Sequence, residues 1–205
     1  MQVSELGIPG SFVVTPRTFE DDRGAFWEWY RFDELAEAVG HPLELRQANA
    51  SVSRRGVVRG IHYADVPPGQ AKYVTVMTGA VLDFVVDIRV GSPTFGTWDA
   101  VELNADSRKA VYVGEGVGHA FVALEDDTTV CYLVSETFAP QRERAVSPLD
   151  PALGLEFGLR DDELVLSDKD RAAHSLAEAM SAGLLPTLAT TDDHVGALNA
   201  AWSPR

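Results

Sequence analysis

The chain has 205 residues, and its formal net charge at pH 7 is -14. This length fits one large domain, and a core of that size needs neither a disulfide nor a metal to be stable. The negative charge argues against nucleic acid and anionic membranes as partners, because both bind basic surfaces. We therefore expect neither nucleic acid nor a membrane among the partners.

Three further features bear on the compartment. Cys131 is the only cysteine, which excludes an intrachain disulfide and fits a reducing environment. Residues 1–5 lack a basic stretch followed by an apolar one, so we expect no signal peptide. The apolar run at residues 81–86 is interrupted by Asp83 and is too short to span a bilayer. These features predict a cytoplasmic protein.

Strand-like segments fill most of the first 140 residues. Residues 26–30 and 73–77 are aromatic or β-branched and lie near glycines, a pattern typical of strands. Residues 80–89 are almost continuously apolar, which predicts a strand buried on both faces. Residues 117–124 and 128–134 continue the series. Short strands at this spacing predict a mainly β sandwich or small barrel.

Helices are expected to be few and short. Residues 33–39 form one, ended by Gly40, and another begins near Ser175, where Ser175 and Glu178 have capping-box spacing. Residues 187–205 mix small and polar side chains, which predicts a loosely held tail. The expected organisation is one domain at residues 1–186, followed by a C-terminal tail at residues 187–205.

A histidine lies in the segment Arg59-Gly60-Ile61-His62-Tyr63. On a regular strand Arg59 and His62 would point to opposite faces. A twist or bulge at Gly60 would bring them together, because glycine accepts such backbone geometry. This segment alone is explained equally well by an ordinary strand histidine.

A second histidine, His119, follows Gly116 at the spacing found in metal-binding cupin barrels. In those barrels two further ligand positions hold a histidine and a glutamate, but here they hold Ala64 and Lys72. A protonated lysine repels a divalent cation and offers it no lone pair. We therefore expect a cupin-like arrangement without a metal.

Six motifs occur in a fixed order along residues 12–185, and together they resemble the dTDP-4-dehydrorhamnose 3,5-epimerase family. The motifs are Asp22-Arg23-Gly24-x-Phe26-x-Glu28, Gln47-x-Asn49-x-Ser51, Arg59-Gly60-Ile61-His62-Tyr63, Lys72, Ser92-Pro93-Thr94-Phe95-Gly96 and Ser167-Asp168-Lys169-Asp170. The resemblance implies a mainly β, cupin-type β-barrel (jelly roll) with a few short helices. It also implies a homodimer, a dTDP-linked 4-keto-6-deoxyhexose as substrate, and neither cofactor nor metal.

The same resemblance implies roles for individual residues. His62 resembles the family's base, Asp170 its carboxylate partner, Tyr132 the acid on the opposite face, and Lys72 the residue that stabilises the enolate. Arg23 and Arg59 resemble the diphosphate contacts, with Arg23 reaching the neighbouring subunit's site. The implied substrate-binding residues are Arg23, Phe26, Glu28, Gln47, Asn49, Arg59, His119, Phe138, Glu143 and Lys169.

The chemistry of a keto sugar explains why such residue types are needed. A carbon beside a ketone loses its proton only if the resulting enolate is stabilised. Histidine is the natural base near neutral pH, a carboxylate fixes its tautomer, and a lysine beside the oxyanion supplies electrostatic stabilisation. Inversion then requires a proton from the other face, which a tyrosine hydroxyl can deliver.

Some positions depart from the family pattern and leave the specificity open. Phe138 stands where a tyrosine is expected near the thymine, and Ala50 and Ala120 replace a common histidine and glycine. One alternative is a mono-epimerase of an antibiotic deoxysugar pathway, acting at carbon 3 or carbon 5 only. Another is a keto-sugar isomerase, and a third is a cupin that merely binds a sugar nucleotide. The last would need the arginines and aromatic residues but not the base, its carboxylate and the acid together.

Overall fold

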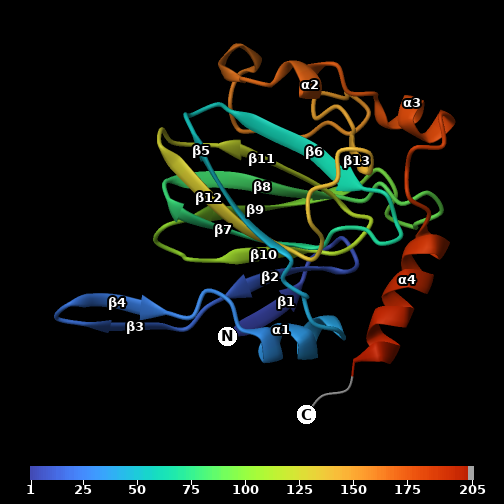
Figure 1. Ribbon diagram of the computed structural model, residues 1–205. Coiled ribbons are helices and arrows are strands. Elements are labelled where there is room, and N and C mark those ends of the chain that lie inside the picture. Colours follow the sequence, from blue (N-terminus) through green and yellow to red (C-terminus); the bar gives the residue numbers. More distant parts are fainter. Residues whose placement is uncertain (203–205) are drawn as a thin grey trace.

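The computed structural model describes residues 1–202, and two antiparallel β-sheets pack face to face at its centre (Figure 1). The six-stranded sheet has the order β1-β2-β10-β7-β12-β5, and the five-stranded sheet has the order β13-β6-β11-β8-β9. The strands of the first sheet are β1 (Gln2–Glu5), β2 (Ser11–Thr15), β10 (Ala110–Val113), β7 (Lys72–Thr78), β12 (Thr128–Val134) and β5 (Gln47–Ser53). Those of the second are β13 (Glu143–Ala145), β6 (Val58–Ala64), β11 (Gly118–Ala123), β8 (Ala80–Val86) and β9 (Trp98–Asn104).

Alternation along the strands decides which side chains enter the space between the sheets. Val74 and Val76 of β7 pack there against Val81 and Val85 of β8, in a cluster that also holds Phe121. Successive strand residues point to opposite faces, so Thr75 of β7 and Leu82 and Phe84 of β8 are directed away from this cluster. The strand at residues 80–89 is buried on both faces as predicted, although β8 ends at Val86.

The mainly β prediction is confirmed, and so is its cupin-type jelly-roll character. The two sheets remain separate in their pairing, so the domain is a jelly-roll-like sandwich and not a closed barrel. Its long strands β7, β8, β11 and β12 lie at the centre of the sheets and carry side chains into the shared interior.

A two-stranded hairpin projects from this sandwich. It consists of β3 (Thr18–Asp21) and β4 (Gly24–Trp27), which pair only with each other and extend away from the rest of the molecule (Figure 1). Phe19 and Phe26 on the hairpin are 45% and 64% exposed. Two large apolar side chains left in solvent on a projecting arm are typical of a surface that contacts another molecule.

Two predicted helices are confirmed with their ends. Helix α1 (Phe32–Val39) ends at Gly40, which is left-handed and donates its N–H to Ala36. Helix α3 (Leu176–Ser181) begins at the capping box of Ser175 and Glu178. The other short helices are η1 (Asp161–Glu163) and α2 (Asp168–Arg171). Within residues 1–202 no helix is long and apolar enough to cross a membrane.

The predicted strand at residues 26–30 is wrong in its second half. Strand β4 ends at Trp27, and Trp29 and Tyr30 instead pack against Tyr73. The Tyr73 hydroxyl donates a hydrogen bond of 2.6 Å to the Trp29 carbonyl. Aromatic residues are typical of strands, but here their packing against the outer face of the six-stranded sheet determines the backbone path.

The prediction of a loosely held tail after residue 186 is also wrong for its main part. Residues Leu188–Ala201 form helix α4, capped by Thr187, and residues 203–205 lie outside the described chain. The helix is joined to the sandwich by a 2.9 Å hydrogen bond from the Leu188 N–H to the Val90 carbonyl. Its one buried residue is Thr191, so no apolar stripe announced it in the sequence. The division into a domain and a tail at residue 186 stays a prediction.

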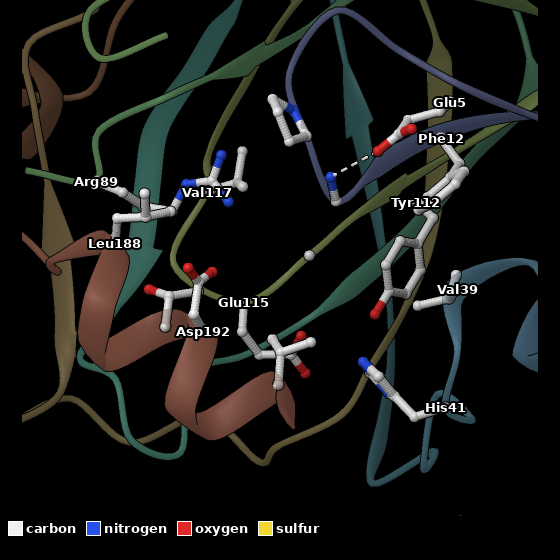
Figure 2. Close-up of a pocket in the computed structure, with 15 residues that line it drawn as sticks. Glu5, Phe12, Val39, His41, Arg89, Tyr112, Glu115, Val117, Leu188 and Asp192 are labelled. Atoms are coloured by element: carbon white, nitrogen blue, oxygen red, sulfur yellow. Dashed lines mark hydrogen bonds between the residues drawn. The ribbon is translucent and has the colours of Figure 1, made fainter. Parts of the chain in front are cut away.

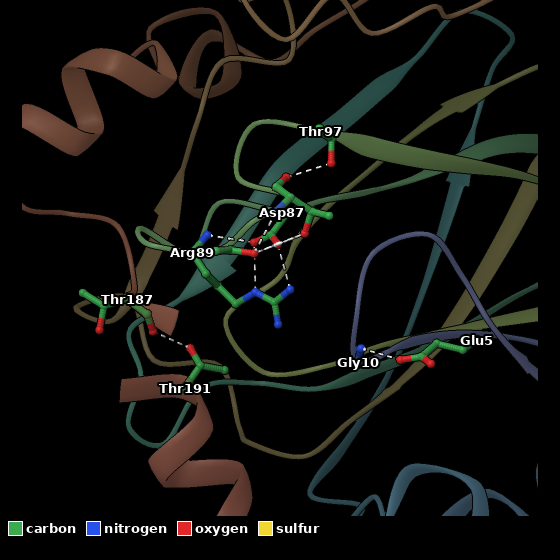
Figure 3. A network of polar contacts seen from close by, with 9 residues as sticks. Glu5, Gly10, Asp87, Arg89, Thr97, Thr187 and Thr191 are labelled. Carbon is green, nitrogen blue, oxygen red and sulfur yellow. Dashed lines mark hydrogen bonds and ion pairs between the residues drawn. The ribbon is translucent and has the colours of Figure 1, made fainter. Parts of the chain in front are cut away.

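Helix α4 covers one end of the sandwich and leaves a hollow of about 230 Å³ beneath it (Figure 2). Tyr112, Glu115 and Asp192 line this hollow. Gly116 permits the close approach of the helix, because a Cβ there would lie 2.6 Å from the Thr191 hydroxyl. Beside it, the buried Asp87 accepts two hydrogen bonds from the Arg89 guanidinium, of 2.9 and 2.8 Å (Figure 3).

Candidate active site

Two adjoining cavities that α4 does not line open into the sandwich, and they share His62, Lys72 and Tyr132. The first, which we call the Arg59 cavity, has a volume of about 150 Å³. Its lining residues are Ser51, Arg59, His62, Lys72, His119, Phe121 and Tyr132. The second, which we call the Gln47 cavity, has a volume of about 390 Å³. Its lining residues are Gln47, Asn49, His62, Gln70, Lys72, Tyr132, Phe138, Glu143, Arg144 and Lys169.

Both sheets contribute to the shared wall. His62 lies on β6 of the five-stranded sheet, opposite His119 of β11. Lys72 begins β7 and Tyr132 lies on β12, two neighbouring strands of the six-stranded sheet. Because side chains alternate along a strand, Lys72 and Tyr132 point to the same interior as Val74 and Val130 of the apolar cluster. The polar site is thus an extension of the sandwich core.

The bulge predicted at Gly60 is confirmed. Arg59 pairs with Phe121 and His62 pairs with His119, so three residue steps on β6 oppose two on β11. Gly60 has a φ of 124°, and an added Cβ would lie 2.4 Å from the His119 carbonyl oxygen. Only glycine fits this position, and the extra residue lets Arg59 and His62 reach the same cavity.

His62 is held by a buried carboxylate. Its Nε2 lies 2.7 Å from Asp170 Oδ1, and the Ser167 hydroxyl donates to Asp170 Oδ2 at 2.9 Å. The His62 side chain is 36% exposed, whereas that of Asp170 is 5% exposed. Burial alone would raise the pKa of Asp170, but the hydrogen bond and charge of His62 and the Ser167 bond hold it below its usual value. Asp170 is therefore ionised, and one imidazole nitrogen is left to act as a base.

Lys72 is buried in the wall between His62 and Tyr132. It is 7% exposed, and its Nζ donates a long hydrogen bond of 3.4 Å to the His62 carbonyl. Burial lowers the pKa of Lys72 from its ordinary range to about 8, against the opposing effect of the Glu143 and Asp83 charges. The ammonium form therefore persists at neutral pH with most of its hydrogen-bonding capacity unused.

Tyr132 stands on the opposite sheet from His62. Burial raises the pKa of its phenol, although the positive charge of Arg59 opposes this shift. The hydroxyl therefore keeps its proton over the physiological range. A base on one sheet and a proton donor on the other, with a shared cavity between them, can act on two faces of one ring.

His119 is paired with Asp83, a residue that the sequence analysis did not assign to the site. His119 Nε2 lies 2.8 Å from Asp83 Oδ2, and Asp83 is 1% exposed. The sequence does carry a signal for Asp83. It lies two residues from both Val81 and Val85, so on a strand it faces the interior together with them. An acid at such a position is typical of a functional site.

The predicted binding residues of the Gln47 cavity come together. The Gln47 amide donates to Asn49 Oδ1 at 2.7 Å and its oxygen accepts the Phe138 N–H at 3.0 Å. The Phe138 ring is 61% exposed at the rim, and Glu143 and Lys169 line the same cavity. In the Arg59 cavity, Arg59 Nε donates to the Ser53 hydroxyl at 3.2 Å.

Three predicted residues do not join either cavity. Arg23, Phe26 and Glu28 lie on or just after the projecting hairpin, and none of them lines the Arg59 or the Gln47 cavity. The Arg23 side chain is 89% exposed and pairs with Asp21 at the hairpin turn. Arg23 is thus presented to solvent on an arm and does not face its own subunit's cavity.

The positions that bind metals in cupin barrels carry other chemistry in this chain. Within residues 1–202 no group of three or more histidine, cysteine, aspartate or glutamate side chains is placed to hold a metal ion. Lys72 directs its ammonium group into the wall of the Arg59 cavity. This fold and site define a class of protein: a cupin-type jelly roll whose cavity carries a histidine–aspartate pair, a lysine and a tyrosine.

Comparison with known proteins identifies the family. The family model for dTDP-4-dehydrorhamnose 3,5-epimerase matches residues 5–178. A dTDP-4-dehydrorhamnose 3,5-epimerase of Mycolicibacterium smegmatis is 56% identical over 189 residues, which cover 92% of each chain. The chain belongs to the dTDP-4-dehydrorhamnose 3,5-epimerase family, and it is an enzyme of that type. The resemblance predicted from the six motifs is thereby confirmed.

Solved structures agree with this assignment. The RmlC epimerase of Mycobacterium tuberculosis superposes with a TM-score of 0.94 at 46% identity, covering 97% of this chain and 100% of that one. ChmJ, a 3'-monoepimerase from Streptomyces bikiniensis solved in complex with dTDP-quinovose, superposes with a TM-score of 0.91 at 46% identity. That comparison covers 95% of this chain and 98% of ChmJ. Members with one and with two sites of epimerisation therefore share this fold.

Proposed function

We propose that the protein epimerises a dTDP-linked 4-keto-6-deoxyhexose at carbon 3, at carbon 5, or at both. The observation that carries this proposal is the shared wall of the two cavities, where His62 and Tyr132 stand on opposite sheets with Lys72 between them. A binding protein would have no use for a base paired with a carboxylate and a proton donor across from it.

The reaction begins at a carbon beside the ketone. The His62 nitrogen that is not bonded to Asp170 removes the proton, and the ionised Asp170 stabilises the imidazolium that forms. The Lys72 ammonium group stabilises the negative charge on the enolate oxygen. Tyr132 then donates its proton to the same carbon from the opposite face, which inverts the configuration.

The remaining predicted residues bind the nucleotide. Arg59, which lines the Arg59 cavity, would bind the diphosphate through charge-assisted hydrogen bonds. The exposed Phe138 ring at the rim of the Gln47 cavity would stack on the thymine. Gln47, Asn49, Glu143, Lys169 and His119 supply the other polar contacts, since all line one of the two cavities.

A mono-epimerase is the second candidate for the activity. It is favoured by the likeness to ChmJ, which is described as a 3'-monoepimerase and was solved with dTDP-quinovose. The substitution of phenylalanine for the expected tyrosine at position 138 also changes the rim of the site. Both activities use the same base, acid and lysine, so the number of inverted carbons is decided by how the sugar ring turns within the cavity.

We further propose that the working unit is a homodimer in which Arg23 enters the partner's site. The hairpin that carries Arg23 projects from its own subunit and exposes two phenylalanines. A symmetric dimer would bury these rings and bring the guanidinium to a cavity that contains Arg59. Phe26 and Glu28 would accompany Arg23 as contacts with the nucleotide.

Mixed dimers test this arrangement. Subunits of the variants His62→Asn and Arg23→Ala are unfolded together and refolded, alongside each variant refolded alone. If Arg23 acts in the partner's site, mixed dimers regain activity well above either variant, because one of their two sites has both an intact His62 and an intact Arg23. Activity no higher than that of the separate variants would place Arg23 within its own subunit.

Two further expectations accompany the proposed function. The site works without a metal or cofactor, so exhaustive chelation should leave activity unchanged, and restoration of lost activity by one divalent ion would contradict this. The protein works in the cytoplasm, a proposal supported by its single cysteine. Its substrate is an activated sugar, and binding such a sugar requires neither a basic surface nor a membrane contact.

Proton NMR of dTDP-4-keto-6-deoxyglucose in deuterium oxide tests the reaction itself. Each carbon that His62 deprotonates loses its proton signal as deuterium enters, and the same reaction run in ordinary water shows each inverted carbon by its changed coupling constants. Exchange and inversion at two carbons identify a 3,5-epimerase, whereas inversion at one identifies a mono-epimerase. If the substrate binds but exchanges no proton at either carbon, the hypothesis that remains is a cupin that binds a sugar nucleotide without catalysis.

A further inference from the structure

Asp83 is a buried acid in the middle of an apolar strand. It lies on β8 between Leu82 and Phe84, and its side chain shares the interior face of the sandwich with Val81 and Val85. It is 1% exposed. Burying a carboxylate among valines is unfavourable unless charges or donors compensate it, so the residues around Asp83 must supply that compensation.

The partners of Asp83 compensate only part of it. Oδ2 accepts from His119 Nε2 at 2.8 Å, while Oδ1 is buried without a hydrogen-bond partner in the described chain from residue 1 to 202. The His119 ring lines the Arg59 cavity, but Asp83 itself does not. Asp83 therefore stands one layer behind the cavity wall with unused accepting capacity.

Lys72 carries a positive charge into the same interior as Asp83. Its strand neighbours Val74 and Val76 enter the same interior cluster as Val81 and Val85 on either side of Asp83. Lys72 and His119 line the same cavity, and Lys72 makes a single long bond, to the His62 carbonyl. Asp83 is thus a buried anion in the same interior as Lys72, and within residues 1–202 the Lys72 ammonium group forms no ion pair.

Several charged or titratable groups surround Lys72, and they act in opposite directions. Burial disfavours the ammonium form, while Glu143 on β13 and Asp83 on β8 favour it. The cationic Arg59 lines the same cavity. His62, His119 and Tyr132 complete the surrounding set. Glu143 lies at the partly exposed rim of the Gln47 cavity, where substrate binds. Asp83 is fully enclosed, so its charge acts on Lys72 whether or not the cavity is occupied.

We propose that Asp83 is a positioning residue whose buried carboxylate keeps Lys72 in its ammonium form and fixes the ring of His119. The proposal rests on the proposed function in one respect, the role of Lys72 as the group that stabilises the enolate. A neutral lysine would offer that oxygen much weaker stabilisation. Asp83 acts through Lys72 and His119 and does not touch the substrate.

The protonation of Lys72 can be measured directly. The only other lysines in the chain are Lys109 and Lys169, so carbon-13 labelling of the lysine ε-carbons gives a simple spectrum, assigned with Lys72→Arg. In Asp83→Asn the titration midpoint of Lys72 should fall by about one pH unit, because an opposite charge has been removed. Lys109 should not move, and Asp99→Asn on the neighbouring strand β9 should leave Lys72 unchanged.

A second variant covers the case in which Asp83→Asn does not fold. Asp83→Val continues the valine pattern of β8 and removes the cost of burying a charge, and it should lower the Lys72 midpoint in the same direction. An unchanged midpoint in a folded variant would overturn the proposal. A midpoint that moves equally in Asp99→Asn would also overturn it, since the effect would then not be specific to Asp83.

The pH profile of exchange connects this measurement to the reaction. Because the ammonium form is the active one, Asp83→Asn should shift the alkaline limb of turnover to lower pH by the amount seen in the NMR titration. Turnover well below that limb should fall less than turnover above it. A limb that stays in place while Lys72 shifts would contradict the proposal. If the wild type exchanges no substrate protons, the proposed function fails, yet the titration still decides whether Asp83 controls Lys72.

Discussion

The sandwich buries charged side chains both beneath α4 and around the two cavities, but their hydrogen-bonding groups are satisfied to very different degrees. Beneath α4, Asp87 accepts hydrogen bonds from the Arg89 guanidinium and from the Ser92 and Thr94 hydroxyls (Figure 3). Around the cavities, Asp83 leaves one oxygen without a partner within residues 1–202, and the Lys72 side chain makes one bond of 3.4 Å there.

The difference separates a structural network from a reactive one. A fully bonded ion pair holds its loops in place, and its groups have no capacity left for a ligand. Groups with unused donors and acceptors are costly in the folded state, and they are retained where a substrate or transition state completes them. Substitutions around the cavities should therefore change rate more than stability, and substitutions beneath α4 should do the opposite.

The largest effect is expected from His62→Asn. The variant removes the base but keeps a polar group beside Asp170, so exchange and inversion should both fall by about a thousandfold or more. Exchange is measured by proton NMR in deuterium oxide, and stability by urea denaturation, which should change little. The exposed His174→Asn is the matched control. Exchange that persists in His62→Asn would mean that another group is the base.

In the region beneath α4, Arg89→Met should destabilise the fold without changing turnover. Removing one partner of a buried ion pair leaves Asp87 charged and enclosed, at a cost of about 3 kcal/mol. Burial would raise the pKa of Asp87, but Arg89, Ser92 and Thr94 together lower it to about 2.

The sign of this linkage fixes the pH window. The contribution of Asp87 is present above its ordinary value of 3.8 and is lost as the pH falls through about 2. The deficit of Arg89→Met should therefore be full at pH 7 and shrink in acid. The measurement is urea denaturation at several pH values, and a deficit that is equal at pH 2 and pH 7 would contradict the charge-based account. The double variant Arg89→Met with Asp87→Asn, which removes both charges, should recover part of the loss.

Tyr132→Phe should separate two steps that His62→Asn abolishes together. The base and Lys72 remain, so an enolate still forms and is protonated again from the side that lost the proton. Deuterium should enter the sugar at a near-normal rate while inversion falls about a hundredfold. Equal losses of exchange and inversion would mean that Tyr132 helps to form the enolate. Unchanged inversion would assign the second proton to another group.

Much of this site could be predicted from the chain because its motifs combine unusual residue types with fixed strand positions. A lysine at position 72 replaces a metal ligand, and in the structure it lines the Arg59 cavity. Gly60 allows the bulge between Arg59 and His62, because no Cβ fits there. The role of Asp83 could not be predicted in this way, because a single acid within an apolar run indicates only an interruption of that run. Its partner His119 is 36 residues away, a contact that no local pattern reveals.

Helix α4 could not be predicted from the sequence for a different reason. Helix α4 buries only Thr191, so its sequence lacks the periodic apolar stripe by which helices are recognised. Its position depends on the backbone pairing of Thr187 with Val90 and on the space left by Gly116. The place of Arg23 in a neighbouring subunit's site was implied by the family resemblance alone, and it stays a prediction because that site lies on a second copy.

The smallest effect, and the one that tests the α4 end most finely, is expected from Glu115→Gln. Glu115 is 4% exposed beneath the helix, and burial raises the pKa of its carboxyl, with the charge of His194 opposing this. A carboxyl whose pKa is higher in the folded state favours folding below its unfolded value of 4.5 and loses that advantage as the pH rises through the folded value. At pH 8 the wild type must bury a carboxylate, whereas glutamine cannot ionise. The variant should thus be more stable by on the order of 1 kcal/mol at pH 8 and equal to the wild type at pH 4, as judged by urea denaturation. Epimerisation should be unchanged, since Glu115 lines neither the Arg59 nor the Gln47 cavity. A loss of stability at pH 8 would mean that the Glu115 carboxylate is held by a partner as firmly as Asp87, and the hollow beneath α4 would then belong with the fully bonded network beside it.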